Sequence, residues 1–419
     1  MNKKQEIKNR IDLINKGEVP EGYKKNKGYI IPDVWDIYPA GNIFKNLSIK
    51  NTDNSEQNVL SVTQDRGVIP REDVGIDIKY NEESLNSYKK VKEGNFIISL
   101  RSFQGGIEYS QYDGIVSPAY TILENILPIN DYFYATYLKM DGFIKRLNTA
   151  VYGIRDGKQI GYDDFSIIPT IYPPKQEQEK IAEILSCCDK VIELKEKLIK
   201  EKNKQKEIIL YNTIHILQNV RHLKLKEISE CFIDGDWIEK KDQSDKGIRL
   251  IQTGNIGLGK FLDKNTKAKY ISELKFEKLH CTEVLPNDIL ISRLPDPVGR
   301  ACIIPRLNER IITAVDCSIM RLKTDYLPEY VILSLNTNDY FKQIKRLTNT
   351  STRDRITRKE LENITIPVVE YKEQKKVAEQ FNCLNNELDL LEQELEQYKQ
   401  LKKSLSQLLL TGIVRVNEV

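Results

Sequence analysis

Cysteine and histidine are scarce in this sequence, and their spacing argues against several kinds of site. The chain of 419 residues has seven cysteines and three histidines. No two cysteines have the C-x-x-C spacing, and an odd count without a framework argues against both a disulfide scaffold and a zinc site. The histidines also lack metal-ligand spacing. We expect reduced, partly buried thiols at Cys187, Cys188, Cys231, Cys281, Cys302, Cys317 and Cys383, and structural roles for His215, His222 and His280.

Long apolar runs and an excess of one charge are also missing. No stretch of about 18 apolar residues occurs, and the first residues, MNKKQEIK, lack the apolar centre of a secretion signal. We therefore expect a cytoplasmic protein that has no membrane among its partners. The 64 basic and 61 acidic residues leave a net charge of only +3. Only the local distribution of charge can therefore indicate a polyanionic partner.

No group of residues forms a convincing catalytic motif. The run GNIGLGK from Gly254 fits the phosphate-binding pattern G-x-x-x-x-G-K, but Phe261 stands where a serine or threonine would hold magnesium. A turn between strands is the better interpretation. The run YPPK at Tyr172 resembles the Asn/Asp-Pro-Pro-aromatic motif of amino-methyltransferases, but tyrosine replaces the acid or amide and lysine replaces the aromatic residue. We predict that the chain by itself is not an enzyme and holds no metal.

The sequence does contain two long helical patterns, each with one narrow apolar face. From residue 377 to 409, apolar residues recur at the a and d positions of about five heptads, and neither glycine nor proline occurs there before Gly412. Residues 176–216 share this register, and QEKIAE at Gln178 matches QKKVAE at Gln374, 196 residues later. We expect two helices of roughly 60 Å that pack against each other. The residues predicted to pack are Ile181, Leu185, Ile192, Ile199, Val377, Phe381, Leu384, Leu388, Leu391 and Leu395.

The segments that precede the two helices also resemble each other, in the same order. VKEGNFIIS at Val91 resembles VLPNDILIS at Val284, and IKRLNT at Ile144 resembles IKRLTN at Ile344. A proline-bearing run then precedes each long helix. The chain is therefore predicted to contain two copies of a globular unit, each followed by a helix. Two similar but non-identical ends suit a target that is split into two halves.

Three stretches carry a resemblance to a known family: PPKQEQEKIAEIL at 173–185, YKEQKKVAE at 371–379 and QLLLTGIVRV from Gln407. In these stretches the chain resembles the specificity subunit of a type I restriction-modification enzyme. The resemblance implies an α+β fold with two globular target recognition domains, separated by two long α-helices packed as an antiparallel coiled coil, and an internal pseudo-twofold repeat. It also implies that each domain reads one half of a bipartite DNA site.

The resemblance further implies partners and cofactors. The partners would be double-stranded DNA and two methyltransferase subunits, joined in the restriction enzyme by two restriction and motor subunits. The methylated base would be adenine at N6. S-adenosylmethionine, ATP and Mg²⁺ would belong to the partner subunits, and this chain would bind none of them. Two alternatives are a specificity subunit of a fused modification-restriction system and, in a different class, a coiled-coil protein–protein adaptor.

The repeat and the resemblance together predict five segments. Residues 1–19 form an N-terminal helical segment, expected to pack near the C-terminus. Residues 20–172 are the first target recognition domain, and residues 173–217 are the first spacer helix. Residues 218–368 are the second recognition domain, and residues 369–419 are the second spacer helix.

Basic and amide side chains in the two domains are the candidates for DNA contacts. Lysine and arginine suit phosphates, and arginine, asparagine and glutamine can bond bidentately to base edges in the major groove. In the first domain the predicted contacts are Gln64, Arg66, Arg101, Gln104, Lys145, Arg146, Arg155 and Lys158. In the second domain they are Gln252, Asn255, Arg293, Arg300, Lys345, Arg346, Arg353, Arg355 and Arg358.

Overall fold

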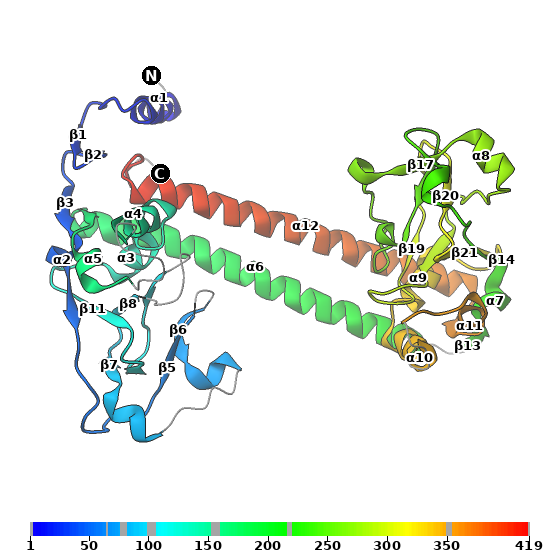
Figure 1. Ribbon diagram of the computed structural model, residues 1–419, viewed down its shortest axis with the longest axis horizontal. Helices are drawn as coiled ribbons and strands as arrows, with labels where there is room; N and C mark the ends of the chain where they lie inside the picture. Colours follow the sequence, from blue (N-terminus) through cyan, green and yellow to red (C-terminus); the bar gives the residue numbers. More distant parts are fainter. Residues whose placement is uncertain are drawn as a thin grey trace. The chain divides into compact units, whose positions relative to one another are not determined.

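The computed structural model describes residues 3–63, 66–75, 82–98, 106–151, 160–215, 220–348 and 354–417. It consists of two compact units, and each unit contains part of both long helices (Figure 1). Unit 1 comprises Met1–Glu196 and Glu394–Val419, and unit 2 comprises Lys197–Gln393. The long helices are α6 (Lys175–His215, 41 residues) and α12 (Tyr371–Leu410, 40 residues).

Unit 1 is built on an antiparallel sheet with the strand order β4-β11-β8-β9. Two-stranded ribbons, β1-β2, β3-β12, β5-β6 and β7-β10, complete its strand pairing among the described residues. Its strands are β1 (Tyr23–Asn26), β2 (Tyr29–Pro32), β3 (Asp36–Pro39), β4 (Phe44–Leu47), β5 (Leu60–Thr63), β6 (Gly67–Pro70), β7 (Lys89–Val91), β8 (Phe96–Ile98), β9 (Ile107–Tyr109), β10 (Gly114–Val116), β11 (Thr121–Asn125) and β12 (Pro169–Tyr172). Its shorter helices are α1 (Lys3–Asn15), α2 (Ala40–Ile43), α3 (Asp131–Tyr137), α4 (Asp141–Val151) and α5 (Tyr162–Ser166).

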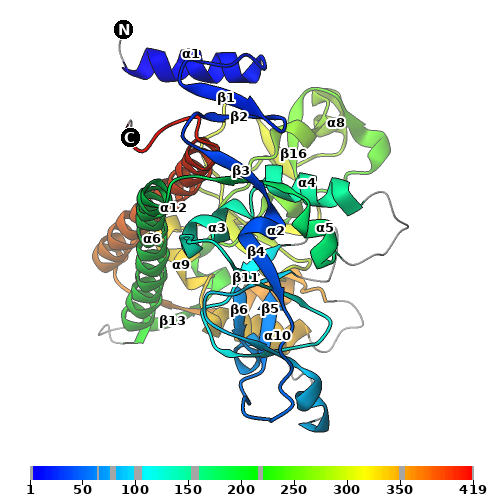
Figure 2. The same ribbon diagram turned by 90° about the vertical axis from the view of Figure 1, so that its left-hand side faces the viewer.

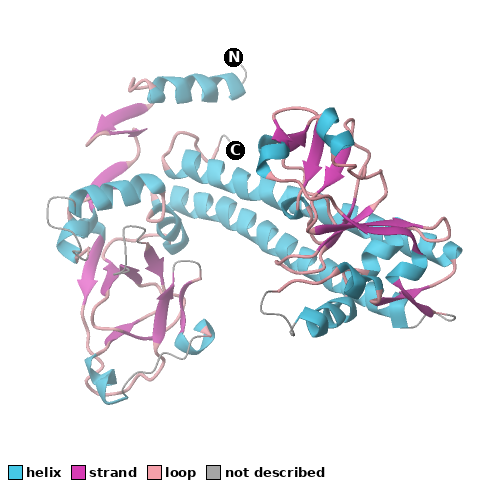
Figure 3. Ribbon diagram, turned by 45° about the vertical axis from the view of Figure 1, so that its right-hand side comes forward, coloured by secondary structure: helices cyan, strands magenta, loops and turns pink. Residues whose placement is uncertain are grey.

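Unit 2 contains the corresponding sheet, in the order β14-β21-β18-β19, and a second four-stranded sheet in the order β15-β17-β16-β20 (Figure 3). Its strands are β13 (Arg221–Lys224), β14 (Ser229–Asp234), β15 (Gln243–Ser244), β16 (Ile248–Ile251), β17 (Lys269–Ile271), β18 (Ile289–Ser292), β19 (Ala301–Ile303), β20 (Ile311–Thr313), β21 (Cys317–Leu322) and β22 (Thr365–Val368). Its shorter helices are α7 (Leu225–Ile228), α8 (Glu273–Lys278), α9 (Pro328–Ser334), α10 (Asn338–Thr348) and α11 (Arg358–Glu362).

The sequence runs that repeat fall on corresponding elements of the two units. The first pair of runs forms β8 and β18, which are buried strands in the same place of their sheets. Each follows a turn with a left-handed residue, Gly94 at φ 93° and Asn287 at φ 71°, a conformation that glycine and asparagine adopt most readily. The second pair forms α4 and α10. The duplication predicted from the sequence is therefore present in the order of the elements.

A buried glutamine attaches each long helix to its globular unit. The Gln178 side chain is fully buried; its oxygen accepts from the Asn130 N–H at 2.8 Å, and its amide donates to the Pro173 carbonyl at 2.8 Å. Gln374 makes the equivalent bonds, to the Leu327 N–H and the Val369 carbonyl, both at 2.9 Å. These bonds satisfy backbone groups that would be costly to bury unpaired. They give a physical reason for the glutamine that opens both copies of the repeated helix motif.

Ion pairs show that α6 and α12 run antiparallel within each unit. In unit 1 Lys195 pairs with Glu394 at 2.6 Å, and the lower-numbered Asp189 pairs with the higher-numbered Lys402. In unit 2 Lys202 pairs with Glu387 at 2.7 Å, and Lys206 lies 4.9 Å above the ring of Phe381. Lys195, Lys202, Lys206 and Lys402 are lysines that interrupt the apolar heptad pattern. Because such pairs are partly exposed, they specify register more than they stabilise the helices.

The predicted packing residues are buried most deeply near the helix ends. Ile181 and Leu185 belong to the core of unit 1, and Val377 and Phe381 belong to the core of unit 2. Leu384 and Leu388 are also buried. Toward the middle of the helices, burial is less complete. The half-buried members of the predicted set are Ile192, Ile199, Leu391 and Leu395.

The chain ends meet in unit 1, where α1 and the turn after α12 lie close together (Figure 2). Arg10 donates to the Ile413 carbonyl at 3.0 Å, and the Tyr23 hydroxyl donates to the Gly412 carbonyl at 2.8 Å. Gly412 has a φ of 72°, a conformation that glycine adopts without strain and that ends α12. The N-terminal segment thus packs near the C-terminus, as predicted from the sequence.

A buried carboxylate joins three distant segments of unit 1. Glu177, at the start of α6, accepts from the Trp35 indole N–H at 2.8 Å. It also accepts from the Arg415 guanidinium in a bidentate pair, at 2.7 and 2.9 Å. The Glu177 side chain is 8% exposed, so water screens this pair weakly. We call Glu177, Trp35 and Arg415 the terminal clasp.

Candidate nucleic-acid interface

The main sheet of each unit is the one with the shared strand order, β4-β11-β8-β9 in unit 1 and β14-β21-β18-β19 in unit 2. In unit 2, four strand ends of this sheet lie at one edge. β14 ends where Asp234 pairs with Ser318, near the start of β21. β18 ends at the same level, because Ser292 pairs with Cys317. β19 begins there too, since Ala301 pairs with Ile291. The loops that leave this edge therefore lie close together, and two of the predicted DNA contacts, Arg293 and Arg300, fall on them.

Three arginines and two aspartates gather at this edge, and we call them the arginine cluster: Arg293, Arg355, Arg358, Asp234 and Asp316. Arg355 pairs with Asp316 at 3.2 Å. Arg358 and Arg293 approach the Asp234 carboxylate at 4.0 and 3.5 Å. The side chains of Arg355 and Arg358 remain 47% and 35% exposed. A phosphate could replace Asp316 at the Arg355 guanidinium, because arginine binds both anions in the same geometry. Arg358 also donates to the Phe232 carbonyl at 3.1 Å and pairs with Glu362 at 3.4 Å.

The donors of Arg300 are used inside the unit, and its role as a DNA contact stays a prediction. Its side chain is buried, and its Nε donates to the Ile256 carbonyl at 2.8 Å. Its two Nη atoms donate to the carbonyls of Leu294, Pro297 and Thr253 at 2.9 to 3.0 Å. Arg300 therefore ties the turn after β16 to the turn after β18. Its buried side chain therefore stabilises the two turns beside this edge.

Arg293 and Asn255 also make hydrogen bonds within the unit, and their roles as DNA contacts stay predictions. Arg293 is 6% exposed and donates to the Val315 carbonyl. Asn255 accepts from the Gln252 N–H at 3.1 Å and donates to the Leu262 carbonyl at 3.0 Å. The Arg293 side chain is buried in these contacts, whereas the Asn255 side chain is half-buried and keeps one amide N–H outside its two bonds. The Gln252 side chain is half-buried on the same turn, and its role as a DNA contact stays a prediction.

The run that imitates a phosphate-binding loop forms a turn, as predicted. Ile256 bridges to Phe261, and the Gly257 N–H donates to the Lys260 carbonyl at 3.0 Å. The Lys260 ammonium pairs with Asp389 of α12 at 2.9 Å. The turn thus attaches the globular part of unit 2 to α12.

Helix α10 places further basic residues near the same edge. The Tyr340 hydroxyl donates to the Gly299 carbonyl at 2.8 Å, which holds α10 against the turn that follows β18. Lys345 and Arg346 are exposed on this helix. Their roles as DNA contacts stay predictions.

In unit 1, three of the predicted DNA contacts are described and differ in their surroundings. Arg146 is half-buried with its guanidinium 4.5 Å above the ring of Tyr29, a cation–π contact within the unit. Lys145 is exposed. Arg66 is exposed and donates to the Asp73 carbonyl at 3.0 Å. The predicted contacts outside the described residues are Gln64, Arg101, Gln104, Arg155, Lys158 and, in unit 2, Arg353.

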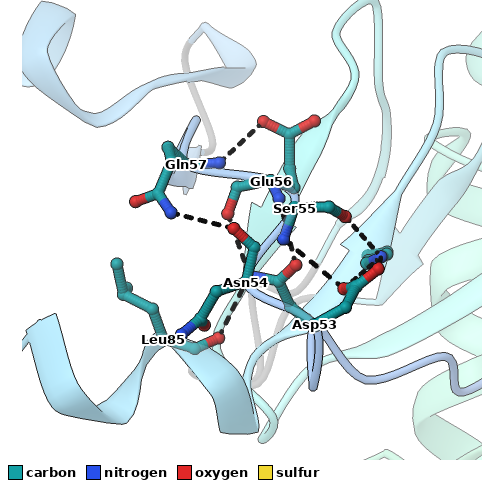
Figure 4. Close-up of polar contacts among 8 residues, drawn as sticks. Asp53, Asn54, Ser55, Glu56, Gln57 and Leu85 are labelled. Atoms are coloured by element: carbon teal, nitrogen blue, oxygen red, sulfur yellow. Dashed lines mark hydrogen bonds and ion pairs between the residues drawn. The ribbon is translucent and has the colours of Figure 1, made fainter.

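The loop after β4 leaves the corresponding edge of unit 1 and is held by a dense polar network (Figure 4). The buried Asn51 donates to the Glu56 carbonyl at 2.8 Å and accepts from the Glu56 N–H. Lys90 donates to Asp53 at 2.7 Å and to Ser55 at 2.8 Å. The Lys90 bond lowers the pKa of the Asp53 carboxyl to about 2. This loop was not singled out from the sequence, although its polar run TDNSEQN was a signal.

The described residues include no group of three or more histidine, cysteine or acidic side chains arranged to hold a metal.

Three cysteines are buried in unit 2, and burial raises the pKa of Cys281 and Cys317 to about 11 and that of Cys302 to about 12. Such thiols are protonated at neutral pH and react slowly. Over the described part of the chain, no helix is both long and apolar enough to cross a membrane.

Comparison with known proteins identifies the class of protein that this fold defines. Residues 24–203 and 218–400 each match the family described as type I restriction modification DNA specificity domain. The chain therefore belongs to the type I restriction-modification specificity family, whose members are not enzymes by themselves. The two matches cover the two copies that were predicted from the internal repeat.

Relatives and solved structures agree with this assignment over nearly the full chain. The MjaVIII specificity subunit of the type I restriction enzyme from Methanocaldococcus jannaschii is 23% identical over 95% of this chain and 97% of its own length. A chain from a structure of a type I R-M system has the same fold, with a TM-score of 0.58 at 14% identity, over 92% of this chain and 100% of that one. The HsdS subunit from Thermoanaerobacter tengcongensis gives a TM-score of 0.51 at 16% identity, over 93% and 100%.

Proposed function

We propose that this chain reads a bipartite DNA site, with one unit on each half-site, and assembles with methyltransferase and restriction subunits. The observation that carries the proposal is the repeated main sheet, together with the arginine cluster at its edge in unit 2. Two similar but non-identical DNA-binding units in one chain suit a target whose halves differ in sequence. Partly exposed arginines at the edge supply the phosphate contacts that such a reader needs.

The long helices act, in this proposal, as an antiparallel coiled coil that sets the gap between the half-sites. Each helix is about 60 Å long, and a duplex turn is about 34 Å, so half-sites less than two turns apart are within reach. The antiparallel ion pairs within each unit support this role. A pseudo-twofold relation between the units follows from the duplication as part of the same proposal.

The methylation chemistry belongs, in this proposal, to the partners. Two methyltransferase subunits would bind S-adenosylmethionine and methylate adenine at N6, and restriction subunits would use ATP and Mg²⁺. This chain would bring them to the site and bind none of these cofactors. A fused modification-restriction partner is the alternative, and a protein–protein adaptor is the alternative outside DNA recognition.

Arg355 tests the proposed DNA contact. We expect Arg355→Ala to reduce the slope of log K against log salt concentration by about 0.9, the value for one lost phosphate contact on duplex DNA. The matched control is Arg310→Ala, because Arg310 is also ion-paired and 44% exposed but lies at the start of β20. The measurement is duplex DNA binding over a series of salt concentrations.

Two outcomes of this titration would contradict the proposal. An equal change in slope for Arg310→Ala and Arg355→Ala would remove the arginine cluster from the interface. The absence of any salt-dependent duplex binding by the unaltered chain would favour the adaptor instead.

A further inference from the structure

The two tryptophans of this chain have opposite surroundings. Trp35 is fully buried and bonded to Glu177, whereas Trp237 is 71% exposed. Trp237 donates its indole N–H to Glu239 at 3.4 Å, at the weak end of hydrogen bonding. Its ring therefore presents a large apolar surface to solvent. Exposed tryptophans are concentrated at binding surfaces, because the ring offers contact area at a small cost in conformational entropy.

The backbone beneath Trp237 is firmly held. The Gly235 N–H donates to the Cys317 carbonyl at 2.8 Å, and the Asp236 N–H donates to the Thr313 carbonyl at 2.9 Å. A Cβ atom at Gly235 would collide with the carbonyls of Thr313 and Ala314, so glycine is required for this close approach. The Asp236 carboxylate also accepts from the Thr282 N–H at 2.9 Å. The loop thus holds the backbone in place where it presents the indole.

This loop lies beside the arginine cluster. Asp236 forms a β-bridge with Ala314. The two residues after Ala314 both interact with arginines of the cluster. The Val315 carbonyl accepts from Arg293, and the Asp316 carboxylate pairs with Arg355. Trp237 also comes only three residues after Asp234, which is itself a member of the cluster. The indole therefore leaves the backbone at the same sheet edge as the partly exposed guanidinium groups.

The carboxylates near Trp237 already have partners within unit 2. Glu239 pairs with Lys241 at 2.7 Å, and this bond lowers the pKa of its carboxyl. Burial raises the pKa of Asp236, whose carboxylate faces the Thr282 N–H. These partners partly neutralise the negative charge of the two carboxylates, which reduces their repulsion of a DNA phosphate.

We propose that Trp237 is a DNA contact of unit 2 and packs its ring against a base edge or sugar of the half-site while Arg355 and Arg358, the partly exposed arginines of the cluster, bind the flanking phosphates. The inference rests on the proposed function and adds a residue to the same interface. A protein partner would also cover an exposed tryptophan, but adjacent arginines held by exchangeable carboxylates favour a polyanion. In an intact duplex the base faces are stacked on one another, so the ring would pack on sugars or on apolar groups of base edges, such as the thymine methyl.

Tryptophan fluorescence of the full chain tests this inference, since only one of the two tryptophans is exposed. The probe is sheared genomic duplex DNA at low salt, with acrylamide as the quencher of exposed indole. The Trp237→Phe variant reports Trp35 alone, and the difference from the unaltered chain isolates Trp237. Trp237→Ala and Trp237→Phe are then compared for duplex affinity, after thermal unfolding shows that both fold.

We expect DNA to shield Trp237 from acrylamide and to leave the Trp35 signal unchanged. Trp237→Ala should weaken duplex binding roughly tenfold, and Trp237→Phe should retain most of the affinity because the ring is kept. If the unaltered chain binds DNA while Trp237 stays equally accessible and Trp237→Ala binds normally, the inference fails and the proposed function stands. If the chain does not bind DNA, both fail. Shielding by a methyltransferase subunit without DNA would assign Trp237 to a protein contact and overturn the inference.

Discussion

Removal of one heptad from each long helix is expected to shorten the gap in the methylated sequence and to leave both half-sites unchanged. The facing segments are residues 192–198 of α6 and 391–397 of α12, because Lys195 pairs with Glu394 and Lys202 with Glu387. Seven residues of helix span about 10 Å, so the gap shortens by at most about three base pairs. Deletion of a full heptad preserves the apolar face of each helix.

Methylation sequencing in cells that produce the shortened chain provides the measurement. A control deletion of residues 192–198 from α6 alone breaks the facing register, and we expect it to abolish site-specific methylation. Changed bases with an unchanged gap would contradict the spacer role of the helices. An unchanged site in both respects would contradict it as well.

Substitution of Glu177 is expected to have the largest effect on stability. Glu177→Ala leaves the Arg415 guanidinium and the Trp35 indole N–H without their buried acceptor. Removal of one partner of a buried ion pair costs about 3–5 kcal/mol. The free energy of unfolding of unit 1 should fall by this amount. Circular dichroism during denaturant unfolding reports both units, and Trp35 fluorescence in a Trp237→Phe background identifies the transition of unit 1.

The second copy of the helix motif supplies the matched control. Glu373 stands where Glu177 stands in the first copy, but its side chain is 39% exposed and lies 3.8 Å from Lys376 on the same helix. Glu373→Ala should therefore cost less than about 1 kcal/mol. Equal losses for the two variants would show that the terminal clasp contributes no special stability.

Local periodicity explains why the helices and the duplication could be predicted from the sequence. The heptad pattern is a property of neighbouring residues, and it located both ends of α6 and the start of α12 to within two residues. α12 ends at Leu410, nine residues before the predicted end at 419, because the chain turns at Gly412 with a φ of 72°. The duplicated runs needed only comparison of the chain with itself. The glutamines that open both helix motifs, Gln178 and Gln374, proved to hold equivalent backbone groups.

The contacts of single arginines could not be predicted in the same way. Arg300 is buried because carbonyls from two separate turns converge on it, and this convergence depends on the packing of strands far apart in sequence. The exposure of Trp237 likewise depends on how its loop crosses the sheet edge. The pairing of β15, β17, β16 and β20 into a second sheet in unit 2 was also not predicted, because it depends on strands far apart in the sequence, such as β16 and β20.

Exchange of residues 20–172 for the first recognition domain of another specificity subunit tests the central claim most directly. Genome-wide mapping of methylated adenines would compare cells that carry the chimera with cells that carry the unaltered chain. The account predicts that one half-site changes while the other half-site and the gap are retained. Replacement of both half-sites, or an unchanged site, would contradict the assignment of one reader to each half.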